Sequence, residues 1–109
     1  MKVSIISKNY GSQTIDTDNF DPFTISKGSP IFKIIEHIWN EWFDHNVKNN
    51  RELNNLYNGW GEDEPAVFTK VGAIQQGMEI FIEEVLELGK KVVTTRDIQK
   101  MDIEAAFEA

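Results

Sequence analysis

The sequence contains no cysteine. This absence excludes a disulfide framework, a zinc site with thiolate ligands and a cysteine nucleophile. Small secreted domains often depend on disulfides for stability, so a cysteine-free chain of 109 residues favours a reducing compartment. We therefore expect a cytoplasmic protein.

Long hydrophobic runs are also missing. No apolar stretch approaches the roughly 20 residues that a membrane-spanning helix needs, and the short apolar stretch after Met1 lacks the pattern of a signal peptide. The sequence shows no glycine-rich phosphate-binding loop, no nucleophile elbow and no Ser-His-Asp order. With only two histidines, it favours a protein that is not an enzyme, has no cofactor and does not bind a membrane.

Positive charge is scarce, and the excess of acid is uneven. The formal net charge is −7. Residues 1–50 carry five lysines against six acidic side chains, whereas residues 51–109 carry six basic against twelve acidic side chains. A negative field repels phosphate backbones, so direct nucleic-acid binding is disfavoured and a basic protein surface is the favoured partner. Solubility alone is the simpler explanation of the same charge.

The first 28 residues favour short strands and loops. Val3 and Ile5 alternate with their neighbours, which predicts a strand over residues 2–7. Residues 13–17 and 23–26 are candidates for two further strands, separated by residues typical of loops. A sheet this small is stable only when a helix covers one of its faces.

A first helix is indicated after residue 28. Ser29 can cap free backbone N–H groups, and Pro30 sits where its missing N–H has no cost. The segment from Ile31 to about Val47 is amphipathic. Its predicted apolar stripe, with Phe43 at the edge, consists of Ile31, Ile34, Ile35, Ile38, Trp39 and Trp42.

The strongest pattern predicts a long helix from Pro65 to about Gly89. Apolar residues recur there at alternating spacings of four and three, which holds one seam over about three heptads. Gly89 is a candidate left-handed cap at the helix end. The seam residues are Val67, Val71, Ile74, Met78, Phe81, Val85 and Leu88.

A last helix is predicted over residues 95–107. Val92 and Val93 form a brief strand or an extended link, and the spacing of Thr94 and Asp97 fits a capping box. The helix would bury Ile98, Met101 or Ile103, and Phe107.

Together these elements predict a single α+β domain over residues 1–109, dominated by helices. Residues 1–28 would supply a small N-terminal antiparallel sheet and loops, and residues 29–109 a helical layer. The alternative is an all-α bundle with an irregular N-terminal arm.

Two acidic clusters are the candidate partner-binding residues. Glu79, Glu83 and Glu87 recur every fourth residue, so they form one stripe on the long helix. Like charges at this spacing repel, and a solvated face, a docking surface and a magnesium site are all compatible with them. The second cluster lies at a predicted turn, where Trp60 either folds back to close the core between helices or, if exposed, would anchor a partner's arginine. It comprises Trp60, Glu62, Asp63 and Glu64.

Two other patterns are compatible with metals. His37, Glu41 and His45 lie on one helix face, which is either a divalent-metal stripe or a solvated surface. The segment from Glu83 to Leu88 resembles the acidic helix of the all-helical nucleoside-triphosphate pyrophosphohydrolases, because Glu84 and Glu87 match their ExxE motif. That resemblance implies magnesium-dependent hydrolysis, but no later segment supplies the family's ExxD motif.

The expected function is that of a non-enzymatic acidic binding protein. Small acidic proteins without catalytic motifs suit inhibitor or immunity roles, for example a phage-encoded or mobile-element inhibitor of a nucleic-acid-binding defence enzyme. The alternatives are a magnesium-dependent pyrophosphohydrolase-like enzyme and a helical homodimeric subunit that associates along the seam of the long helix. The sequence leaves a monomer and a homodimer open.

Overall fold

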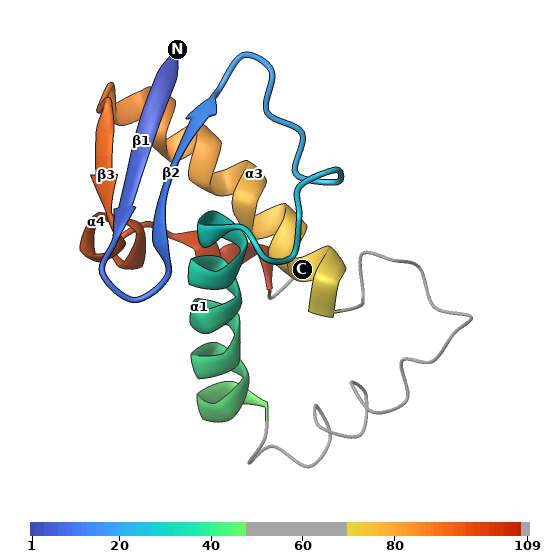
Figure 1. Cartoon of the computed structure of the whole chain (residues 1–109). Coiled ribbons are helices and arrows are strands. Elements are labelled where there is room, and N and C mark those ends of the chain that lie inside the picture. Colours follow the sequence, from blue (N-terminus) through green and yellow to red (C-terminus); the bar gives the residue numbers. More distant parts are fainter. Residues whose placement is uncertain (48–69, 108–109) are drawn as a thin grey trace.

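The structure is a computed structural model that describes residues 1–47 and 70–107. Helices dominate it and a small three-stranded sheet completes it, which confirms the predicted α+β class (Figure 1). The presence of the sheet excludes the all-α alternative. The elements are β1 (Lys2–Ser7), β2 (Gly11–Asp16), α1 (Pro30–Asn46), α3 (Lys70–Leu88), β3 (Val92–Thr94), α4 (Thr95–Gln99) and the 3₁₀ helix η2 (Ile103–Ala106).

The sheet has the strand order β2-β1-β3. β1 and β2 form the predicted antiparallel hairpin, with Val3 opposite Ile15. The third strand differs from the prediction, because β3 pairs with β1 in parallel and places Val93 opposite Ile5. The sheet is therefore mixed, and its third strand comes from near the other end of the sequence.

Residues 23–26 were the predicted third strand, and this prediction is wrong. They belong to the loop between β2 and α1, where Phe23 is exposed. The reason is local: the Phe23 backbone N–H donates to Asp21 Oδ1 at 2.9 Å, and the Thr24 N–H donates to the Asp21 carbonyl at 3.3 Å. An aspartate that binds the backbone following it favours a turn over a strand.

α1 begins where the sequence predicts. Ser29 Oγ accepts from the Phe32 N–H at 3.4 Å, and Pro30 is the first helical residue. Gln13 of β2 satisfies a second free donor, because its Oε1 accepts from the Ile31 N–H at 2.8 Å and ties the helix to the sheet. The apolar stripe is confirmed, with Phe43 partly buried at its edge and these residues buried: Ile31, Ile34, Ile35, Ile38, Trp39 and Trp42.

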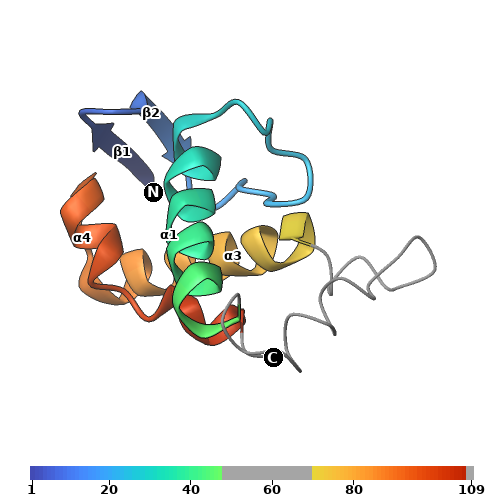
Figure 2. The same cartoon turned by 90° about the horizontal axis from the view of Figure 1, so that it is seen from below.

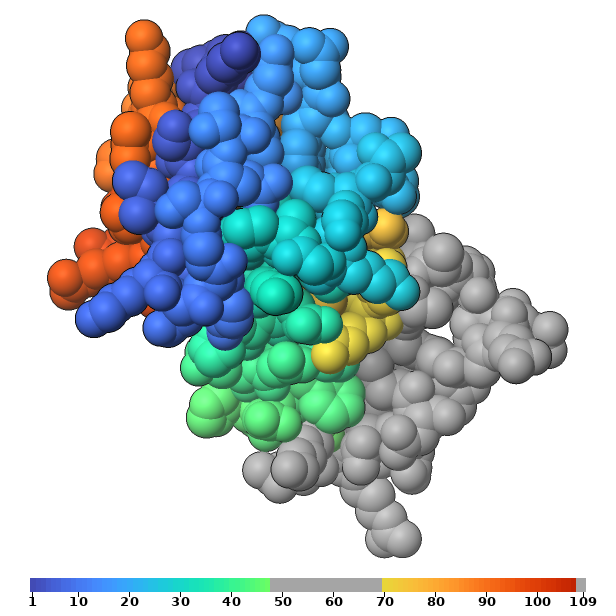
Figure 3. Space-filling model, viewed as in Figure 1, coloured from blue at the N-terminus to red at the C-terminus, as the bar shows by residue number. Residues whose placement is uncertain are grey.

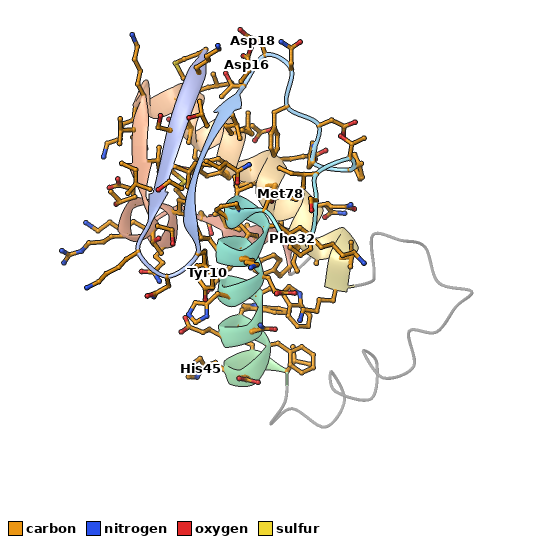
Figure 4. The ribbon with its side chains drawn as sticks, in the orientation of Figure 1. Tyr10, Asp16, Asp18, Phe32, His45 and Met78 are labelled. Atoms are coloured by element: carbon orange, nitrogen blue, oxygen red, sulfur yellow. The ribbon has the colours of Figure 1, made fainter. Side chains whose placement is uncertain are left out.

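The seam of α3 is buried along most of its length. Ile74, Met78, Phe81 and Val85 are buried, and the helix packs on α1 and η2 of the same chain. Phe32 and Met78 lie near the crossing of α1 and α3 (Figure 4). Val71 is partly buried, and Val67 lies outside the described residues.

Leu88 was expected on the seam, and that is wrong, because it is 56% exposed. The helix ends there: Gly89 has a φ of 66° and its N–H donates to the Val85 carbonyl at 2.9 Å. This is the predicted left-handed end.

The predicted helix over residues 95–107 is two short elements, α4 and η2. The capping box is confirmed, since Thr94 Oγ1 accepts from the Asp97 N–H and Asp97 accepts from the Thr94 N–H. A continuous helix would point Ile98 and Ile103 in directions about 140° apart. The break lets the chain bury all of Ile98, Met101, Ile103 and Phe107.

The buried side chains of the described residues form one core cluster. α3 runs behind the sheet in Figure 1, and Figure 2 shows the sheet and α3 apart from each other. The outer face of the sheet is open, as the blue strands in the space-filling view show (Figure 3). Ile6 and Val92 on this face are about half exposed, at 49% and 52%.

Candidate functional site

The acidic stripe of α3 faces water. Glu79, Glu83 and Glu87 are all exposed, while the seam on the other side of the helix is buried. This arrangement follows from the helical period, because residues that avoid the four-and-three spacing of the seam must point away from the core. The structure therefore brings these three predicted partner-binding residues together on one accessible face.

No cation neutralises the stripe within residues 1–47 and 70–107. The ion pairs there join the Met1 amino group to Asp16 and Asp18, Lys70 to Glu36, and Lys90 to Asp97. Lys91, four residues beyond Glu87, is exposed and forms no ion pair with it. The stripe therefore presents a concentrated negative charge to solvent.

An apolar side chain stands among these carboxylates, and sequence reasoning missed it. Leu86 is 50% exposed and lies three residues after Glu83, on the same side of α3. Ile82, one turn earlier, is partly buried at the edge of the core. The signal was available, because Leu86 is a large apolar residue off the buried seam. We define the acidic face of α3 as Glu79, Glu83, Leu86 and Glu87.

The other predicted cluster cannot be placed beside this face. Trp60, Glu62, Asp63 and Glu64 lie outside the described residues. Their role as partner-binding residues therefore stays a prediction, and the acidic face stands without them.

The end of α3 is fixed to the next element by charge. Lys90 Nζ lies 3.2 Å from Asp97 Oδ1. The backbone N–H of Thr94, then Lys90 and the Thr94 hydroxyl, donate to the Asp97 carboxylate and lower its pKa. These contacts hold the C-terminal end of the acidic face against β3 and α4.

Two members of the histidine stripe of α1 are in contact. His37 Nε2 lies 3.1 Å from Glu41 Oε1, while His45 is exposed at the far end of α1 (Figure 4). In the part of the chain that the structure describes, no group of three or more His, Cys, Asp or Glu side chains is arranged to hold a metal ion. Of the ExxE pair, Glu84 is partly buried and Glu87 is exposed. The pyrophosphohydrolase alternative stays a prediction.

Comparisons with known proteins identify no relative that bears on this site. No known family matches the chain, and no curated protein or solved structure matches it significantly. Among the described residues, none of the helices has the length and hydrophobicity needed to cross a lipid bilayer.

Proposed function

We propose that this protein is a non-enzymatic binding protein that docks on a basic partner surface through the acidic face of α3. The observation that carries this proposal is a stripe of three exposed carboxylates without ion pairs, with the half-exposed Leu86 at its edge. Unpaired carboxylates repel one another along a helix at a cost of a few tenths of a kcal/mol per pair. A partner's lysines and arginines would remove that repulsion on binding.

The two kinds of side chain serve different parts of association. Charge complementarity steers the encounter and raises the association rate, especially at low salt. An apolar residue inside a polar surround contributes to the lifetime of the complex once water is excluded from it. Leu86 is placed for the second role and the glutamates for the first.

The favoured partner is a protein whose basic surface normally receives nucleic acid. A chain with a net charge of −7 is repelled by phosphates but attracted to the surfaces that bind them. An inhibitor or immunity protein that occupies such a surface competes with the nucleic acid for it. A phage-encoded or mobile-element inhibitor of a nucleic-acid-binding defence enzyme is one protein of this kind.

The test begins with capture of the partner from the native host at low and high salt, followed by its identification and purification. Association rates are then measured for the wild-type protein and for a variant that combines Glu79→Lys, Glu83→Lys and Glu87→Lys. We expect the variant to associate at least about ten-fold more slowly and to lose most of its salt dependence.

A matched control separates local docking from overall charge. Asp44, Asp102 and Glu104 are exposed and belong to α1, to η2 or to the residue before η2, so none of them is part of the acidic face of α3. Their combined reversal to lysine changes the net charge by the same amount as the α3 variant. Equal slowing by both variants would show that only the net charge matters, and unchanged rates in the α3 variant would remove the proposal.

A further inference from the structure

A polar pocket lies between the turn of the β1–β2 hairpin and α1. Its volume is about 400 Å³. The helical residues that line it are spaced by three, one and three positions, so they share one face of α1, opposite the buried stripe. The lining residues are Asn9, Tyr10, Lys33, Glu36, His37 and Asn40.

The walls of this pocket are held in place by contacts on both sides. The Tyr10 backbone N–H donates to Ser7 Oγ at 3.0 Å, which fixes the hairpin turn. The rings of Tyr10 and His37 lie 6.3 Å apart between centroids and are tilted by 48°. Figure 4 shows Tyr10 beside α1. These contacts fix the hairpin turn and place Tyr10 beside His37 at one wall of the pocket.

The charges around the pocket leave one cation available. Glu36 is paired with Lys70 at 3.5 Å, and His37 Nε2 lies 3.1 Å from Glu41 Oε1. Lys33 has no ion pair among the residues that the structure describes, and it is exposed. Glu36 also lines the pocket but is paired, so Lys33 is the lining group that an anionic ligand would contact.

The remaining groups favour a ligand with a planar ring. The amides of Asn9 and Asn40 each offer donors and an acceptor, which match the edge of a heterocycle. The Tyr10 ring offers a face on which a base can stack, and such stacking tolerates different bases. A volume of about 400 Å³ falls within the usual range for small-molecule sites.

We propose that this pocket binds a nucleoside monophosphate, with the phosphate at Lys33 and the base against Tyr10. One phosphate group does not meet the repulsion that a long phosphate backbone would meet from this acidic protein. No residue of the acidic face of α3 lines the pocket, so the proposal is independent of the docking function proposed above.

The test is a titration followed by amide chemical shifts of the isotopically labelled protein. The probes are AMP, GMP, CMP and UMP, with inorganic phosphate and adenosine in separate arms. We expect saturable shifts at residues 8–10 and 33–40 with the monophosphates at millimolar concentration, and much weaker binding of phosphate or adenosine alone. Equal binding of either fragment, shifts confined to other regions, or no saturation would each overturn the proposal.

Variants localise the two parts of the ligand. Lys33→Met keeps most of the side-chain length and removes the charge, and we expect about ten-fold weaker monophosphate binding. Tyr10→Leu removes the stacking face and should weaken binding by a similar factor. Lys100→Met, at an exposed lysine after α4, is the matched control and should bind as the wild type does. Wild-type affinity in both pocket variants, with well-dispersed spectra, would refute the proposed site.

Discussion

Gly77 of α3 and Ile103 of η2 lie so close that a β-carbon built on the glycine would stand 2.9 Å from Ile103 Cγ2. The same β-carbon would lie 3.0 Å from Ile35 Cγ2 of α1 and 3.3 Å from Phe107 Cε1. Two separate segments, α1 and the η2 segment with its C-cap Phe107, therefore converge on one residue of α3. α3 packs this closely against α1 and η2 because Gly77 has no side chain.

Gly77→Ala should destabilise the protein, although alanine is the better helix former. The gain in helix propensity is about 1 kcal/mol, whereas overpacking a tight core costs about 1 to 3 kcal/mol. The side chains of Ile35 and Ile103 are branched at Cβ, so they have few rotamers with which to move away from a new methyl group. We expect a net loss of about 1 kcal/mol in the free energy of unfolding, measured by urea denaturation.

Gly28→Ala is the control for this substitution. Gly28 lies in the loop before α1, and a β-carbon there would meet only Ser26 Oγ, at 3.7 Å. Its free energy of unfolding should equal or slightly exceed that of the wild type, because alanine restricts the unfolded chain. A Gly77→Ala variant as stable as Gly28→Ala would show that the crossing of α3 with α1 and η2 has room to spare.

The sequence predicts the elements whose residues are regular along the chain. The stripe of α1 and the seam of α3 each repeat over several turns, so the buried residues and the exposed acidic face follow from periodicity alone. Caps at Ser29 and Thr94 were predictable for the same local reason. The functional roles of the predicted partner-binding residues remain predictions.

Contacts between distant segments could not be predicted in this way. β3 is only three residues long, so Val92 and Val93 show no periodic hydrophobic pattern. Their parallel pairing with β1 arises because α3 returns the chain to the sheet. The start of α1 is tied to the hairpin by Gln13, whose Oε1 accepts from the Ile31 N–H. Neither relationship leaves a signal in the spacing of residues. Leu86 lies outside the four-and-three spacing of the seam, so the periodicity that predicts the buried residues does not include it.

Glu83→Lys should have opposite effects on stability and on docking. Glu83 lies between Glu79 and Glu87 at four-residue spacing, so a lysine there replaces two repulsive pairs by two attractive ones. We expect the protein to gain a few tenths of a kcal/mol in the free energy of unfolding. If the acidic face docks on a basic partner, the same variant associates more slowly.

The two effects are read by thermal melting and by association kinetics. Glu104→Lys makes the same charge change at an exposed residue of η2 and provides the control. A Glu83→Lys variant that is more stable and also binds at the wild-type rate would show that the stripe is a solvated face only.

The carboxylate of Asp97 should contribute to acid sensitivity. The backbone N–H of Thr94, then Lys90, lower its pKa from the ordinary value of 3.8. A group whose pKa is lower in the folded state stabilises that state above the ordinary value, and the contribution is lost as the pH falls through the lower folded pKa. Asp97→Asn should therefore reduce the melting temperature at pH values near neutrality.

The difference between wild type and Asp97→Asn should shrink as the pH is lowered below 3.8. Melting curves across this range give the measurement. Asp102→Asn serves as the control, because Asp102 is exposed and its side chain makes no cap hydrogen bond to η2. A constant difference between Asp97→Asn and wild type at every pH would contradict the assigned role of the charge.

Two adjacent threonines should respond in opposite ways to the same substitution. Thr95 Oγ1 is buried and has no hydrogen-bond partner among the described residues. Thr95→Val removes this unsatisfied hydroxyl at nearly constant shape, and we expect a gain of about 1 kcal/mol in the free energy of unfolding.

Thr94 Oγ1, by contrast, accepts from the Asp97 N–H at 3.3 Å and donates to Asp97 Oδ2 at 3.0 Å. Thr94→Val removes this cap and should cost about 1 kcal/mol. Urea denaturation of both variants gives the comparison, and a loss of stability in Thr95→Val would mean that its hydroxyl is satisfied after all.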